Sequence, residues 1–289
     1  MGETISNAKR GGFIYAATLL LFLAVFLIGR EILSVLRVSD TAFYAVNSLY
    51  SVAAFLFAAI FYARAISKKT YTLKFNPFYV IPSFLLAAGM LCGAGFLNSL
   101  IAQTVKSAGG VVSEPQIPLE TPFQYVLFTV CLCLLPAVSE ELFFRGVLTD
   151  SLSGISAVAS VFTVSLCFSL YHGNVAQIVY QFVYGIGLGF LALKAKSIIP
   201  SVIAHFLNNF AVLSIEYFKI PINLNELPVI AVGLTLLAGF VLFMIFFGEK
   251  PILSKKQIER IKDFYVPFGI VGIAVCVIII VLSALPLNV

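Results

Sequence analysis

Apolar runs of about 20 residues recur along this chain, and they limit its fold more than any other feature. A helix needs about 20 predominantly apolar residues to cross the hydrocarbon core of a bilayer. Of the 289 residues, 61% are hydrophobic and only 11% are charged, whereas about a quarter of a soluble domain is charged. The runs lie at residues 12–29, 41–63, 77–103, 122–150, 155–172, 175–193, 199–217, 228–247 and 265–285. The sequence therefore predicts an all-α, polytopic transmembrane helix bundle of about eight to nine spans.

The first run could be mistaken for a signal peptide, because it follows Lys9 and Arg10. It lacks a small-residue cleavage site and further spans follow it, so we interpret residues 12–29 as a retained anchor. The five cysteines all lie in apolar runs and have no CxxC spacing. Such cysteines are expected to be unreactive packing residues.

The basic residues predict the orientation of the bundle. If successive spans alternate in direction, four basic residues fall on one side of the membrane, and these are Arg30, Arg37, Lys106 and Lys219. Arg145 lies within a span, and the other Lys and Arg residues fall on the side of the N-terminus. Cytoplasmic loops carry an excess of Lys and Arg. We therefore expect an integral membrane protein with a cytoplasmic N-terminus, in the plasma membrane if the source is prokaryotic. The charges form no basic soluble face, so we expect no nucleic-acid partner.

Three charged residues interrupt the fourth run, in the stretch AVSEELFFRGVL at 137–148. Each charge is expected to cost about 2.5–3.5 kcal/mol at the centre of a membrane helix. Glu141 and Arg145 are four residues apart and share a helix face, so they can pair. Glu140 points about 100° away and has no basic residue at that spacing. One glutamate is thus predicted to be neutralised by Arg145 and the other to face a cavity. The alternative is that all three charges form one packing network.

Both histidines of the chain lie in the spans that follow. His172 comes four residues after Phe168, and His205 comes four residues before Asn209. Polar groups inside spans usually face the bundle interior and mark a functional site. Depth in the membrane can be counted along each helix at about 1.5 Å per residue. Counted from the turn after the fourth span, Glu140, His172 and His205 lie at depths where their side chains can meet. We therefore predict a polar pocket that opens to the cytoplasmic side.

The residue types of this pocket favour hydrolysis. Burial in an apolar site favours the neutral form of a carboxyl group, which suits a general base near neutral pH. A neighbouring imidazole can orient water or carry a proton. A second imidazole and a side-chain amide can donate hydrogen bonds to a developing oxyanion. No Ser or Cys is spaced to act as a nucleophile beside a base. Attack of water on an amide, without an acyl-enzyme, is the simplest reaction that uses all these groups.

The ordered motifs resemble those of the CPBP family, which comprises the type II CAAX prenyl endopeptidases and bacterial relatives, some of them linked to bacteriocin self-immunity. The motifs are Glu140-Glu141-x-x-x-Arg145, Phe168-x-x-x-His172 and His205-x-x-x-Asn209. The resemblance implies that Glu140 is the water-activating carboxylate, with His172 beside it. It implies that His205 and Asn209 stabilise the oxyanion. It also implies that Glu141 and Arg145 support the site structurally.

The resemblance divides the chain into three parts. Residues 1–120 are expected to form N-terminal transmembrane helices, residues 121–212 a CPBP-like catalytic core, and residues 213–289 C-terminal transmembrane helices. We expect no appended soluble domain.

A catalytic zinc is one alternative for the chemistry. Glu140, His172 and His205 can supply the three protein ligands of such a site. Against it, Asn is an unusual zinc ligand, and no HExxH pair occurs. Glu140 would also have to serve as both ligand and base. We therefore favour a metal-independent mechanism and leave the metal question open.

The leading functional hypothesis is a peptidase of the CAAX prenyl endopeptidase type. It would act as an intramembrane endopeptidase that cleaves a peptide or a membrane-associated protein, with the lipid bilayer as its other partner. The alternative is a non-catalytic membrane immunity or chaperone-like binding protein that uses the same pocket. A third hypothesis is a transporter with Glu140 as a proton relay. A transporter of this kind predicts repeated halves with broken helices, and no such repeat is found in the sequence.

Overall fold

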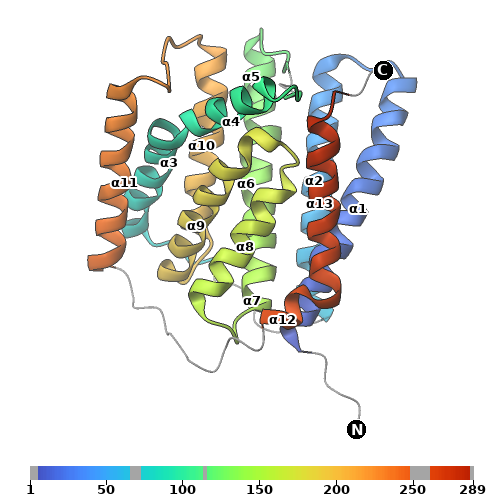
Figure 1. Ribbon diagram of the computed structural model, residues 1–289, viewed down its shortest axis with the longest axis vertical. Coiled ribbons are helices and arrows are strands. Elements are labelled where there is room, and N and C mark those ends of the chain that lie inside the picture. Colours follow the sequence, from blue (N-terminus) through green and yellow to red (C-terminus); the bar gives the residue numbers. More distant parts are fainter. Residues whose placement is uncertain (1–5, 66–72, 113–115, 248–260, 287–289) are drawn as a thin grey trace.

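The computed structural model describes residues 6–65, 73–112, 116–247 and 261–286. Every regular element within these ranges is a helix (Figure 1). Among the described residues, eight helical segments are long and apolar enough to cross a membrane, and they are Asn7–Val35, Asp40–Arg64, Pro77–Ser107, Pro122–Ser151, Val175–Ala195, Ile199–Tyr217, Leu227–Phe247 and Ile261–Ala284. Another apolar helix, Ala157–Tyr171, is shorter. The prediction of an all-α polytopic bundle is confirmed.

The elements follow the chain in three groups. The first comprises α1 (Asn7–Val35), α2 (Asp40–Ala65), η1 (Pro77–Tyr79), α3 (Val80–Ala94) and α4 (Phe96–Ser107). The second comprises α5 (Pro122–Phe128), η2 (Thr129–Leu134), α6 (Leu135–Glu141), η3 (Leu142–Leu148), α7 (Thr149–Ser151), α8 (Ala157–Tyr171), η4 (Val175–Gln177), α9 (Ile178–Ala195) and α10 (Ile199–Tyr217). The third comprises α11 (Leu227–Phe247), α12 (Ile261–Phe264), η6 (Tyr265–Gly269) and α13 (Ile270–Ala284).

In the Pro122–Ser151 span, π-helical segments lie on both sides of the two glutamates. A π-helical segment, η2, directly precedes α6, which contains Pro136 near its start. A proline ring clashes with the carbonyl of the preceding turn and removes a hydrogen bond, and the wider turn of η2 accommodates it. A second π-helical segment, η3, follows Glu141 and carries Arg145. Such segments within helices are frequent at functional sites.

Aromatic side chains hold this span between α2 and α8. The ring of Phe55 on α2 stacks on that of Phe143 at a centroid distance of 4.8 Å. The ring of Phe144 packs edge-on against that of Phe168 on α8 at 5.3 Å. All four side chains are fully buried. The helix that carries the glutamates is therefore central in the bundle and has protein on both sides.

Glycines allow α9 to pack closely against α8. A Cβ atom at Gly185 would lie 3.1 Å from Ser165 Cβ, and one at Gly189 would lie 3.0 Å from Val161 Cγ1. Small residues spaced in this way let membrane helices approach one another. The same device joins α11 to α3, where a Cβ atom at Gly233 would overlap the backbone of Gly93. The α8–α9 contact places Gly185, whose carbonyl oxygen accepts a hydrogen bond from Arg145, beside the helix that carries the second motif.

The two ends of the bundle carry different elements. In Figure 1, α7 and α12 lie at the lower end, together with the start of α1, and α4 and α5 lie at the upper end. Six of the basic residues used to predict orientation lie outside the described part of the chain, and they are Lys68, Lys69, Lys250, Lys255, Lys256 and Arg260. The assignment of the lower end to the cytoplasm stays a prediction.

Candidate active site

Glu141 lies at the centre of a buried ionic cluster. Its Oε1 atom accepts a hydrogen bond from Arg145 Nη1 at 2.7 Å and another from His205 Nδ1 at 3.0 Å. Arg145 Nη2 donates to the carbonyl oxygen of Gly185 at 3.1 Å. All three charged or ionisable side chains are buried. The contact between Glu141 and Arg145 agrees with their four-residue spacing, and His205 joins it from α10.

Glu140 is buried beside this cluster but is not part of its hydrogen bonds. Only 6% of the residue is exposed. Among the described residues, its Oε2 atom has no hydrogen-bond partner. The nearest ring nitrogen is His205 Nε2, at 3.9 Å from Oε2, which is longer than a hydrogen bond. The two adjacent glutamates thus have different surroundings. Glu141 is fixed through Oε1, although its Oε2 also lacks a hydrogen-bond partner among the described residues, whereas no hydrogen bond fixes Glu140 there.

Both imidazole rings are held through Nδ1. His172 Nδ1 donates to the carbonyl oxygen of Phe168 at 2.8 Å, because a carbonyl oxygen can only accept. His205 Nδ1 donates to the Glu141 carboxylate in the same way. A neutral ring that donates from Nδ1 carries a lone pair at Nε2. His205 can therefore donate to an oxyanion only when its ring carries a second proton at Nε2, which is a condition that the sequence did not suggest.

The Phe168 ring lies between one charged or ionisable side chain from each of the three motifs, and these are Arg145, His172 and His205. Its centroid lies 4.8 Å from that of His172 and 5.7 Å from that of His205, and both pairs meet edge to face. The guanidinium carbon of Arg145 lies 4.3 Å above the same ring. A cation over an aromatic face is attracted by the ring quadrupole. Phe168 thus orders both histidines and Arg145 around one rigid side chain.

Asn209 is the predicted site residue with the fewest contacts to the others. It is half-buried and lies one helical turn beyond His205 on α10. Its Oδ1 atom accepts from Asn208 Nδ2 at 3.4 Å. No hydrogen bond joins it to Glu140 or His172 within the part of the chain that the structure describes. Asn208 is buried and accepts a hydrogen bond of 2.6 Å from the Tyr180 hydroxyl.

Two tyrosines near the site were not predicted. Tyr184 on α9 is 1% exposed, and its hydroxyl has no partner among the described residues. Its ring centroid lies 6.3 Å from that of His205. Tyr171 lies beside His172 at 5.5 Å between ring centroids and interacts electrostatically with Glu140. The only sequence signal for either residue was a hydroxyl within an apolar helix.

The possible zinc site does not fit this geometry. Within residues 6–65, 73–112, 116–247 and 261–286, no three His, Cys, Asp or Glu side chains are grouped so that they could hold a metal ion. The ring of Phe168 packs against both His172 and His205. We therefore derive no chemical step through a metal.

Residues 122–211 match the model of the type II CAAX prenyl endopeptidases, Rce1-like. The match covers less than half of the chain, and this segment is similar to the CAAX protease family. The matched range contains all three motifs. This similarity supports intramembrane protease function in general, and the helical spans agree with an integral membrane protein. No curated protein and no solved structure matches the chain.

Proposed function

We propose that this protein is an intramembrane endopeptidase that cleaves a peptide or a membrane-associated protein by attack of an activated water molecule. One observation carries the proposal. No hydrogen bond fixes the buried Glu140 carboxylate among the described residues, while Glu141 beside it is held through Oε1 by Arg145 and His205. A buried carboxylate held next to an imidazole but free of hydrogen bonds is suited to general base catalysis.

In the proposed reaction, Glu140 takes a proton from water as the water oxygen bonds to the amide carbon of the substrate. The resulting tetrahedral intermediate carries a negative oxygen. The carbon–nitrogen bond then breaks, and the leaving amine takes the proton from Glu140. Donation to the amine returns Glu140 to its ionised form, and the carboxylic acid product then releases its own proton, so that the products are a carboxylate and an amine.

The histidines have separate proposed roles. His172 Nε2 is an acceptor in the neutral ring and would orient the attacking water. His205 is held by Glu141 with Nε2 toward Glu140. It would donate to the oxyanion when its ring is doubly protonated. The Asn209 amide would supply a second donor, and Glu141 and Arg145 would keep His205 in position.

The proposed topology has a cytoplasmic N-terminus and a site that opens to the cytoplasmic side, in the plasma membrane if the source is prokaryotic. The excess of basic residues at the end that carries α7 and α12 supports it.

Cleavage of a reporter substrate by purified protein tests the proposal. We expect turnover by the wild-type protein and none by Glu140→Gln, with both variants recovered in similar amounts. In cells, uncleaved precursors should accumulate equally in a deletion strain and in one that carries Glu140→Ala. Tight binding of the same precursor without turnover would instead favour a binding protein and contradict the endopeptidase.

A further inference from the structure

One face of α10 leads from the proposed site to the upper end of the bundle. His205, Asn209, Val212 and Glu216 lie within about 60° of one another around the helix axis, at 100° per residue. Exposure rises along this face. His205 is buried, Val212 is 51% exposed, and the Glu216 side chain is 67% exposed. A substrate segment that reaches the site could therefore continue along this face.

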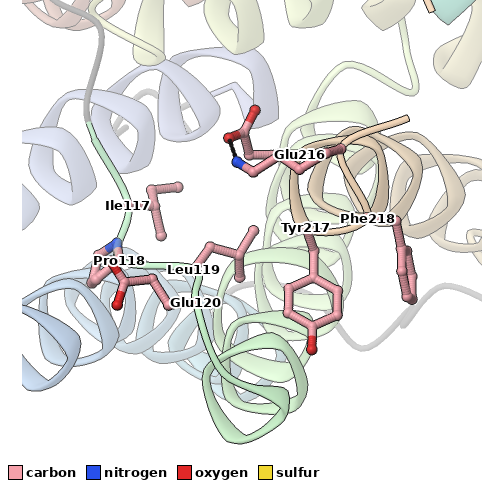
Figure 2. Close-up of a pocket in the computed structure, with 8 residues that line it drawn as sticks. Ile117, Pro118, Leu119, Glu120, Glu216, Tyr217 and Phe218 are labelled. Atoms are coloured by element: carbon pink, nitrogen blue, oxygen red, sulfur yellow. Dashed lines mark hydrogen bonds and ion pairs between the residues drawn. The ribbon is translucent and has the colours of Figure 1, made fainter. Parts of the chain in front are cut away.

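Two adjoining pockets lie beside the upper half of this face. The first has a volume of about 710 Å³ and is walled by Ile117–Glu120 on one side and Glu216–Lys219 on the other. Figure 2 shows these two segments on either side of the pocket, with Glu216, Tyr217 and Phe218 on the α10 side. The second has a volume of about 660 Å³ and includes Leu91 and Val212 in its lining. Because the pockets share Ile117, Leu119 and Glu216, they form one groove.

The mouth of the groove is acidic. Glu120 and Glu216 both line it, and so does Lys219, which pairs with Glu216 at 2.6 Å. Two carboxylates and one ammonium group leave a net negative charge. No ion pair involves the Glu120 side chain within the described residues. The floor is apolar, with Leu91, Val212 and Leu213 among its residues, so the groove favours a ligand that is apolar along its length and basic at one point.

The wall opposite α10 has backbone groups available for pairing. Residues 116–120 form no helix, and Thr121, which follows them, has an extended backbone with φ −118° and ψ 154°. Neither Ile117 nor Leu119 forms a backbone hydrogen bond with another described residue. Extended peptides are commonly bound by main-chain pairing with such segments, while pockets select alternate side chains.

We propose that this groove is a specificity site for the peptide substrate, which it binds in extended form with a basic side chain between Glu120 and Glu216. The proposal rests on the endopeptidase function proposed above. Because the groove lies at the end of the bundle opposite α7 and α12, it applies to a substrate segment that extends through the bundle from the groove to the site. Along α10, Glu216 lies about 10 Å beyond Asn209 and about 16 Å beyond His205, at ~1.5 Å per residue. An extended peptide advances about 3.3 Å per residue. The selected Lys or Arg is therefore three to five residues from the bond that is cut.

Binding to the Glu140→Gln protein tests the groove without requiring turnover. The ligands are fluorescent peptides of one apolar sequence in which a single lysine is moved one position at a time. We expect the tightest binding at one position and weaker binding at higher salt. Glu120→Gln and Glu216→Gln should each weaken binding of the best peptide by about two- to fivefold, as for exposed ion pairs. Glu31→Gln, which alters an exposed carboxylate on α1 outside the groove, should have no effect.

A charge exchange gives the sharpest result. Glu120→Lys should weaken binding of the lysine peptide and improve binding of the peptide with glutamate at the same position. Equal binding of all lysine positions, or equal effects of Glu31→Gln and Glu120→Gln, would contradict the groove. So would a bilayer lipid that copurifies at the groove and is not displaced by the lysine peptide.

The two proposals fail separately. Wild-type cleavage of these peptides with no preference for lysine position would contradict the specificity site and leave the endopeptidase standing. Lysine-dependent binding without cleavage by the wild-type protein would support the groove and contradict the endopeptidase.

Discussion

Glu141 Oε1 accepts a hydrogen bond of 3.0 Å from His205 Nδ1, across 64 residues of sequence. This contact gives the two adjacent glutamates different surroundings, in line with the different roles proposed for them. Glu141 is occupied by His205 and by Arg145, so it fixes an imidazole ring in one orientation. Glu140, which has an unpaired oxygen in the described structure, is the one proposed to act as the base.

The two glutamates are therefore expected to respond differently to the same substitution. Glu140→Gln keeps the side-chain volume and removes the base, so it should abolish cleavage and leave protein abundance near normal. Glu141→Gln removes the counter-charge of buried Arg145, and breaking a buried pair costs about 3–5 kcal/mol in soluble proteins. Abundance after membrane extraction and cleavage of a reporter are the two measurements. Equal loss of abundance in both variants would favour a single structural network.

Gly185 is predicted to be essential for packing of α9 on α8. In Gly185→Ala the new methyl group would lie 3.1 Å from Ser165 Cβ and 3.3 Å from Phe168 Cδ1. Overpacking of this kind typically costs about 1–3 kcal/mol. Since Phe168 contacts both histidines, activity should fall together with thermal stability. Gly239→Ala is the control, because its methyl group would meet only Leu85, at 3.8 Å. Equal melting temperatures of the two variants would contradict the prediction.

The orientation can be measured without reference to enzymatic activity. Topology reporters fused at Lys69, Lys194 and Lys256 should report the cytoplasm, and one near Ser107 should report the opposite side, because basic residues are retained in the cytoplasm. Lys69 and Lys256 lie outside the described residues. A reporter at Lys256 that reads as external would overturn the predicted number of spans.

Cleavage is expected to survive a strong chelator. No three metal-binding side chains are grouped within the described ranges, and the proposed mechanism uses Glu140 as the base alone. The measurement is turnover of the reporter substrate before and after chelation, followed by addition of zinc. Loss of activity on chelation and recovery with zinc would contradict the metal-independent mechanism.

The sequence predicted the parts of the site that depend on local geometry. Apolar run lengths predicted the helices, and the four-residue spacing of Glu141 and Arg145 predicted a contact that is present at 2.7 Å. The contact between Glu141 and His205 was not predicted, since it depends on how α10 packs against α6. Helical rises give depth along an axis but not the rotation of one helix relative to another.

The contacts of Asn208 and Tyr184 also depend on how helices pack, so the sequence did not predict them. The 100° separation of Asn208 from Asn209 follows from helix geometry, but it did not reveal that the Tyr180 hydroxyl donates a hydrogen bond to Asn208. The buried hydroxyl of Tyr184 belongs to a helix whose close approach depends on Gly185 and Gly189. Neither glycine can be distinguished in the sequence from others in apolar runs.

The two neighbouring asparagines provide the last prediction. If Asn209 donates a hydrogen bond only as the substrate oxygen gains charge, its effect belongs to the transition state. Asn209→Ala should then lower kcat by about 10²–10³ with KM little changed, as for loss of one oxyanion donor. His205→Ala should act on the same charge, so the double variant should lose less than the product of the single effects.

Asn208→Ala should behave differently, because Asn208 is buried and accepts a hydrogen bond from Tyr180 at 2.6 Å. It leaves a buried hydroxyl without its partner, which costs about 1–3 kcal/mol, so stability should fall more than kcat. Tyr180→Phe is the matched control, since it removes the other half of the same hydrogen bond. Steady-state kinetics and thermal unfolding of the variants separate the two effects. An unchanged kcat in Asn209→Ala, with turnover present, would remove Asn209 from the proposed oxyanion site.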